Sequence, residues 1–167
     1  QAHLHLIPFA RDSHQVWQVH NTMEPPACPD FSGTWLLTDV AGDIDKILKA
    51  LGMNYATRTA IWMAGYGKGK ETKRIGYEGG NMVVENSQGN KDVHILGDGD
   101  DLSDPPKKRT ISWVSEDGDQ VLKMDIQDVQ GSAPPEEWRW KLTNPNTHEV
   151  KWMCKDFTAT MTFTKQM

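Results

Sequence analysis

The sequence has little of what marks several common protein classes. Cysteine occurs only twice in 167 residues, as Cys28 and Cys154, and two cysteines cannot build a disulfide framework or a four-ligand zinc site. No apolar run approaches the roughly 20 residues that a membrane-spanning helix needs, and no signal peptide opens the chain. The net charge is −5 with both signs interspersed, so the basic surface that binds nucleic acid is missing. We therefore expect neither a nucleic-acid partner nor a membrane span.

The two cysteines also bear on location. Two free thiols are typical of a reducing compartment, and we therefore expect a cytoplasmic protein. The alternative is a single bridge from Cys28 to Cys154 that ties the two ends of the chain together. The chain starts at Gln1 rather than at a methionine, which indicates a processed product or a segment of a longer protein.

Residues 1–28 differ from the rest of the chain. They hold four of the six histidines and end in a proline-rich stretch at residues 25–29, which is typical of an extended boundary. The total length fits one domain with an appendage. We therefore predict an N-terminal arm over residues 1–28 and one folded domain over residues 29–167.

A helical period appears in one part of the chain. Between Asp43 and Gly52 the apolar residues recur at the spacing of one helix face, and they are Ile44, Ile47, Leu48 and Leu51. A second helix is predicted over residues 55–64, with Asn54 as its N-cap and Gly65 just beyond its end. Two consecutive helices predict a helix-turn-helix lid.

The remainder is typical of short strands joined by turns. A first strand is predicted over residues 31–37, where aromatic and apolar side chains surround Gly33. After the helices, turn residues such as those at 97–100 separate further strand candidates, at residues 74–77, 82–85, 92–96, 109–114, 121–129, 138–143, 150–154 and 158–163. Strands at hairpin spacing form an antiparallel meander, and closing the meander into a barrel removes its exposed edges.

Two motifs carry a resemblance to a known family. The F-x-G-x-W stretch at residues 31–35 and the A-L-G-x-x-x-A-x-R stretch at residues 50–58 resemble the intracellular lipid-binding proteins, which include the fatty-acid-binding and cellular retinoid-binding proteins. Residues 155–160 resemble the closing hairpin of that family. The resemblance covers residues 30–167 and implies an all-β, ten-stranded antiparallel barrel of the calycin type, a β-clam, with a helix-turn-helix lid. It also implies that Tyr55, Arg58 and Ile61 lie on the second helix, beside the portal for the ligand.

The family's carboxylate anchor is missing from its expected positions. Fatty-acid-binding members hold a carboxylate with an Arg-x-Tyr pair on the last strand, and those positions here are Met161 and Phe163. A further family arginine falls near Trp140. Strand alternation places Trp138 and Trp140 on one face and Arg139 on the other, while a slip of one residue would turn Arg139 inward as an alternative anchor.

The apolar wall that this register predicts favours a neutral ligand. Trp138, Trp140, Trp152, Met161 and Phe163 would line the cavity, and an unpaired carboxylate against them would be destabilised. A neutral hydrophobic molecule gains about 0.8 kcal/mol per buried methylene. We therefore expect a retinoid-, carotenoid-, sterol- or pigment-like ligand in a cavity with no fixed positive charge at its base.

No motif in the sequence indicates catalysis. A nucleophile elbow, a metalloprotease helix and a dinucleotide fingerprint are all missing, so we expect a non-catalytic carrier without cofactor or metal. The arm's histidines are interpreted as solvated, with a metal pair or a pH switch as alternatives. The alternative function is an interaction or structural subunit whose barrel docks onto a larger assembly through residues 1–28, an arm that is poor in charge and contains Leu4, Phe9 and Trp17.

Overall fold

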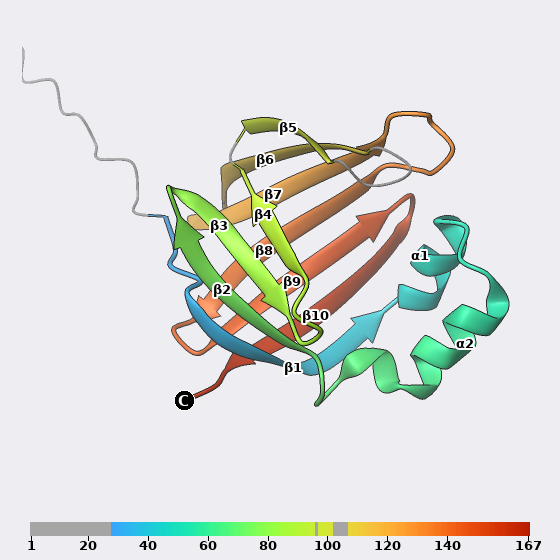
Figure 1. Ribbon diagram of the computed structural model, residues 1–167, viewed down its shortest axis with the longest axis horizontal. Helices are drawn as coiled ribbons and strands as arrows, with labels where there is room; N and C mark the ends of the chain where they lie inside the picture. The colour runs from blue at the N-terminus through green and yellow to red at the C-terminus, as the bar shows by residue number, and fades with distance from the viewer. Residues whose placement is uncertain (1–27, 96, 102–106) are drawn as a thin grey trace, which may run out of the picture.

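The computed structural model describes residues 28–95, 97–101 and 107–167. Strand β1 (Gly33–Gly42) leads into the helices α1 (Ile44–Ala50) and α2 (Tyr55–Met63) and a short 3₁₀ turn, η1 (Gly65–Gly67). Within the described residues, nine more strands follow without another helix (Figure 1). They are β2 (Thr72–Glu78), β3 (Asn81–Asn86), β4 (Lys91–His94), β5 (Gly97–Asp101), β6 (Lys107–Glu116), β7 (Asp119–Asp128), β8 (Glu136–Asn144), β9 (Thr147–Cys154) and β10 (Phe157–Lys165).

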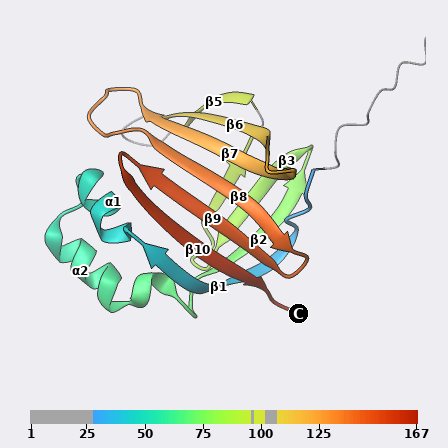
Figure 2. The same ribbon diagram turned by 180° about the vertical axis from the view of Figure 1, so that it is seen from behind.

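One antiparallel sheet contains all ten strands, in the order β4-β3-β2-β1-β10-β9-β8-β7-β6-β5. Seen from behind, the sheet runs unbroken from β1 through β10, β9 and β8 to β7 (Figure 2). In the described part of the chain β4 and β5 are the two ends of the sheet, and they do not pair with each other. The predicted ten-stranded barrel is therefore confirmed as a nearly closed barrel with a seam between β4 and β5.

The residues at the end of β1 determine how the chain passes from this strand into the lid. A bulge between Leu37 and Asp39 shifts the pairing with β10, so that Leu37 and Val40 both pack toward the core. Gly42 has a φ of +88°, and a Cβ atom there would lie 2.4 Å from the carbonyl oxygen of Thr158. Only glycine tolerates both the positive φ and the close approach.

The two helices form the predicted lid at one end of the barrel (Figures 1 and 2). Asn54 caps α2, since its side-chain oxygen accepts a hydrogen bond from the backbone N–H of Thr57 at 2.9 Å. Helix α1 buries Ile44, Ile47 and Leu48 against the ends of β9 and β10. In contrast, Arg58 is the buried residue of α2, so α2 contributes little to the core.

Two apolar clusters build the core. The larger one centres on Phe31, Trp35 and Phe163, where the indole N–H of Trp35 donates to the carbonyl oxygen of Phe31 at 2.8 Å. The smaller one joins α1 to Trp152 and Ala159. Three members of the larger cluster, Val84, Met124 and Trp140, also line a cavity inside the barrel.

The structure decides two further expectations, on the turn at residues 97–100 and on the cysteine pair. The residues at 97–100, predicted as a turn, begin strand β5. Cys28 and Cys154 are both free, with Cys154 buried, so the alternative bridge between them does not form. Among the described residues, no helix is long and apolar enough to cross a membrane.

Candidate ligand-binding cavity

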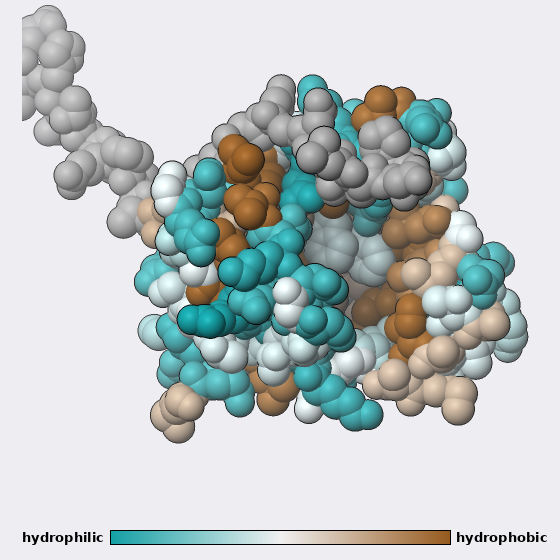
Figure 3. Space-filling model, viewed as in Figure 1, coloured by the Kyte–Doolittle hydropathy of each residue, from teal (hydrophilic) through white to brown (hydrophobic). Residues whose placement is uncertain are grey.

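A cavity of about 320 Å³ opens inside the barrel between β2–β4 on one side and β6–β8 on the other. The space-filling view shows this face of the molecule hollowed between the strands and the lid (Figure 3). The apolar wall of the cavity consists of Val84, Met124, Ile126, Trp138 and Trp140. Its polar wall includes Lys73, Asn86, Asp92, His94, Lys107 and Arg109. The interior is therefore amphipathic rather than uniformly apolar.

The register of β8 is the one predicted from alternation. Trp138 and Trp140 line the cavity, while Arg139 forms ion pairs with Glu116, at 2.6 Å, and with Glu137. The pairing of β8 with β9 is regular from Glu136 to Leu142, and its irregularity begins only after Leu142. Arg139 therefore lies on the outer face, and the alternative in which it anchors a ligand is wrong.

Lys73 is a residue of the candidate site that the sequence did not predict. It lies on β2 and lines the cavity, and its Nζ atom is 4.9 Å from the ring centroid of Trp140 and 4.8 Å from that of Phe163. Aromatic faces attract a cation at this distance. The expectation of a cavity without a fixed positive charge is therefore wrong.

Burial explains the unusual acidity of this lysine. Loss of solvation lowers the pKa of Lys73 to about 8, against the opposing influence of the negative charges on Glu71 and Asp92. The residue was missed because the predicted strand began at residue 74. Because residue 73 was placed outside the strand, the alternation of side chains between the inner and outer faces of the barrel could not be applied to it.

A polar bridge crosses the seam of the barrel beside the cavity. Arg109 on β6 donates to Oδ1 of Asp92 on β4 at 2.7 Å, and Nε2 of His94 lies 3.1 Å from Oδ2 of the same carboxylate. Burial acts to raise the pKa of Asp92, but the hydrogen bonds with His94 and Arg109 outweigh it and hold that pKa well below its usual range. Asp92 is therefore ionised, and its negative charge is matched by Arg109.

The cavity wall also contains buried hydrogen-bonding atoms without partners. Within the described part of the chain, the indole Nε1 atoms of Trp138 and Trp140 and the Nδ1 atom of His94 have no hydrogen-bond partner. An indole N–H can only donate, and leaving a buried donor unpaired costs about 1–3 kcal/mol. All three residues line the cavity, so a bound acceptor that reached the two indole N–H groups would reduce this cost.

His148 closes the base of the cavity behind Trp140. Its ring is fully buried, stacks on Trp140 and Phe163 at centroid distances of 5.8 and 4.9 Å, and meets the edge of Trp35 at 4.5 Å. Burial, with a contribution from the positive charge of Lys73, lowers the pKa of His148 to about 3. The imidazole is therefore neutral, which lets it pack as an aromatic ring.

The other residues predicted for the site lie beside the cavity rather than on its wall. Trp152 stacks on Trp138 at 4.7 Å, and its indole N–H donates to Glu136 at 2.9 Å. Phe163 is fully buried, and Met161 packs against both core clusters.

The lid residues predicted beside the portal are spread over α2. Tyr55 is 76% exposed, whereas Arg58 is buried and Ile61 packs against the cluster below the lid. The structure therefore brings Trp138 and Trp140 to the cavity wall, and leaves the lid residues apart from it.

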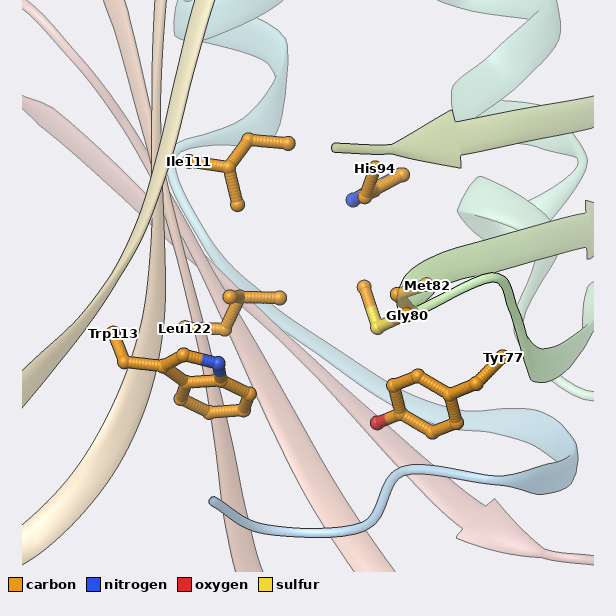
Figure 4. A pocket seen from close by; sticks show the side chains of 7 residues that line it. All are labelled: Tyr77, Gly80, Met82, His94, Ile111, Trp113 and Leu122. Atoms are coloured by element: carbon orange, nitrogen blue, oxygen red, sulfur yellow. The ribbon is translucent and has the colours of Figure 1, made fainter. Parts of the chain in front are cut away.

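A second, much smaller space of about 20 Å³ lies elsewhere inside the barrel. Figure 4 shows His94, Met82 and Tyr77 on one side of it and Ile111, Leu122 and Trp113 on the other. His94 lines this space and the larger cavity alike. The small space is too narrow for more than a water-sized group, so the larger cavity is the candidate ligand site.

The fold and its interior cavity define a small antiparallel barrel of the class that encloses small molecules. A solved structure similar to this chain is the fatty-acid-binding protein 1 of Echinococcus granulosus, with a TM-score of 0.61, 20% sequence identity, and coverage of 82% of this chain and 98% of that chain. The chain therefore has the fatty-acid-binding-protein fold, and the resemblance to the intracellular lipid-binding proteins is confirmed at the level of the fold. No family model and no curated protein matches the sequence.

Proposed function

We propose that this chain is a non-catalytic carrier that binds a hydrophobic small molecule inside its barrel. A fatty-acid-binding-protein-like barrel suggests this general function. The observation that supports it most is the cavity of about 320 Å³, whose apolar wall faces an interior lysine and buried indoles without partners. A core that only packs against itself would satisfy its polar groups internally.

The same wall indicates what the ligand contains. An apolar body would lie on Met124, Ile126 and Trp138, while an oxygen acceptor would face Lys73 and the indole N–H of Trp140. About ten buried methylenes contribute roughly 8 kcal/mol, which is enough to offset much of the roughly 4–15 kcal/mol lost on association. A retinoid-, carotenoid-, sterol- or pigment-like molecule that carries a hydroxyl or carbonyl group fits this description.

Lys73 changes the argument about ionised ligands. Neutral ligands were expected because the sequence predicted an interior without a cation. The ammonium of Lys73 lies in that interior, so this reason no longer holds. A carboxylate would still lose its hydration in a cavity where Arg109 and Lys107 are already paired, with Asp92 and Glu136. We therefore propose a neutral ligand with an oxygen acceptor, and a fatty acid is the direct competitor to be measured.

A titration with three probes tests this proposal. Retinol, palmitate and the oxygen-free polyene diphenylhexatriene would each be titrated against the full chain, with binding followed by quenching of tryptophan emission. Retinol is expected to bind tightest. Preference for palmitate would contradict the proposal of a neutral ligand. Equal affinity for retinol and diphenylhexatriene would contradict the proposed role of an oxygen acceptor. If no probe binds, the carrier function itself is overturned.

The surface of α2 favours a second candidate function. Tyr55, Trp62 and Met63 are 76%, 64% and 76% exposed, and exposed apolar side chains that gather on one element are typical of docking surfaces. This supports the alternative of an interaction subunit, whose arm over residues 1–28 lies outside the described residues except for Cys28. Deleting residues 1–28 should leave retinol binding intact in a carrier, whereas in an interaction subunit it should abolish partner association.

A further inference from the structure

We propose that Lys73 forms a reversible imine with apolar aldehydes that enter the cavity, so that the barrel captures this class of carbonyl compound covalently. The proposal rests on the proposed function, because the cavity must first admit a hydrophobic ligand. It goes beyond that function by assigning a chemical reaction to one side chain.

The surroundings of Lys73 distinguish it from the other cations on the cavity wall. Lys107 pairs with Glu136 at 3.2 Å, and Arg109 pairs with Asp92 at 2.7 Å. Lys91 also lines the cavity, but it is exposed to solvent. Among the described residues, no carboxylate forms an ion pair with Lys73; its Nζ atom instead lies against the rings of Trp140 and Phe163. No ion pair within the described chain has to be broken before this amine reacts with a ligand.

The same surroundings make the amine nucleophilic. With the pKa of Lys73 at about 8, about half of the molecules carry the neutral amine at pH 8, because the two forms are equal where pH equals pKa. A lysine with the ordinary pKa of about 10.4 is neutral in well under 1% of molecules at that pH. The fraction of neutral, reactive amine at pH 8 is therefore about a hundredfold higher for Lys73 than for an ordinary exposed lysine. Buried amines of this kind are the ones that form Schiff bases.

The reaction needs no component besides the amine and the aldehyde. The nitrogen lone pair of Lys73 attacks the carbonyl carbon, the nitrogen gives up a proton to the carbonyl oxygen, and the carbinolamine loses one water as the C=N bond forms. Addition of water reverses these steps. The charges of Glu71 and Asp92, which favour a positive charge at this nitrogen, would also stabilise the protonated imine.

The aldehyde body would use the apolar wall already described. Trp138 and Trp140 present aromatic surface, and Met124 and Ile126 complete it. A conjugated or long-chain aldehyde gains burial there, whereas a small polar aldehyde gains almost nothing. The expected substrate class is therefore the apolar aldehydes, with all-trans-retinal as the probe.

The experiment compares retinal with retinol, which occupies the same volume but cannot form an imine. The full chain would be incubated with retinal at pH 8, reduced with sodium cyanoborohydride and analysed by intact mass and peptide mapping, while retinol binding is measured on the same preparation. One adduct per chain, on Lys73, is expected. Its initial rate should exceed that at an exposed lysine such as Lys68 by about a hundredfold.

Two variants sharpen the test. Lys73→Arg keeps a positive charge and should lose the adduct, whereas Lys68→Arg removes an exposed lysine paired with Asp39 and should keep it. If retinol binds and retinal gives no adduct on Lys73, or labels lysines at random, the imine is overturned while the carrier function stands. If neither retinol nor retinal associates with the chain, both proposals fall.

Discussion

The ammonium of Lys73 lies 4.9 Å from the ring centroid of Trp140, so that a cation from β2 meets an aromatic face from β8 across the inside of the barrel. The contact joins the two walls of the cavity. It also places a positive charge that has lost solvation on burial next to an indole whose N–H has no partner within the described residues. We expect both the stability of the barrel and its choice of ligand to depend on this pair.

Replacing Lys73 with methionine should stabilise the protein at pH 7. The pKa of Lys73 falls from an ordinary value near 10.4 to about 8 on folding, so between these two values the unfolded chain binds more protons than the native one. Stability of the native protein therefore rises as pH rises from about 8 to about 10, by up to about 3 kcal/mol. Lys73→Met should lack this rise in urea unfolding, and should exceed the wild-type stability at pH 7.

The control for that variant is Lys68→Met, because Lys68 is exposed and pairs with Asp39. It should leave the pH dependence between 8 and 10 in place. A Lys73→Met protein that is less stable than the wild type at pH 7 would show that the contacts with Trp140 and Phe163 outweigh the cost of burial.

Replacing His148 with phenylalanine should protect the protein against acid. The pKa of His148 falls from about 6.5 in the unfolded chain to about 3 in the native one, so native stability is lost as pH drops through this window. Both ring nitrogens are buried without partners in the described structure, and phenylalanine removes that cost as well. The variant should keep more of its stability at pH 4, as seen in thermal unfolding followed at pH 7 and pH 4. Equal losses in both proteins would contradict the assignment.

The indole N–H of Trp140 should contribute to ligand affinity. Trp140→Phe keeps an aromatic ring but removes the donor, and the dissociation constant for retinol should rise about five- to tenfold, which corresponds to roughly 1–1.5 kcal/mol. Trp113→Phe is the matched control, because Trp113 stacks on Phe31 and lines the small space instead of the cavity. Emission of bound retinol is the readout. Similar effects of the two substitutions would argue against a hydrogen bond from Trp140.

Replacing Arg109 with methionine should loosen the seam. Asp92 would lose its 2.7 Å hydrogen bond from β6, while its contact with His94 stays on β4. The side chain of Asp92 is half exposed, so the loss of this pair should destabilise the fold by only about 1 kcal/mol or less. Hydrogen exchange should accelerate in the amides of β4 more than in those of β9. Uniform acceleration across the barrel would mean that the pair stabilises the whole fold and not the seam.

Gly42 and Gly76 offer a contrast within the same barrel. A methyl group at Gly42 would meet the carbonyl of Thr158 at 2.4 Å with φ at +88°, whereas nothing lies within 4 Å of the Cβ position at Gly76. Gly42→Ala should therefore cost about 2–4 kcal/mol, and Gly76→Ala should change stability by less than about 1 kcal/mol. Chemical denaturation of both variants gives the comparison. A tolerated alanine at residue 42 would show that the start of the lid can shift.

Local patterns were enough to predict much of the fold. The apolar spacing around Ile47 and the cap at Asn54 predicted both helices, and alternation placed Trp138 and Trp140 on the cavity side of β8. Residues 97–101 were missed because glycine and aspartate favour turns, while pairing with β6 holds them as a strand. Here tertiary pairing overrides local preference.

The polar part of the site could not be predicted from local patterns. Lys73, Asp92 and Arg109 come from three strands that are far apart in sequence, and they meet only because the barrel curves β4 back toward β6. A charged residue at the end of a strand is usually solvated. Sequence alone gave no reason to place these three inside.

The seam has a consequence for how copies of this protein meet. Within the described chain β4 pairs on one side only, and such an edge invites a strand from another molecule, the first step of aggregation. Strand β4 spans only four residues and begins with Lys91 and Asp92. Short length and charge are both means by which natural edges resist intermolecular pairing. The carboxylate that bridges the seam thus also keeps the open edge of the barrel from acting as a template.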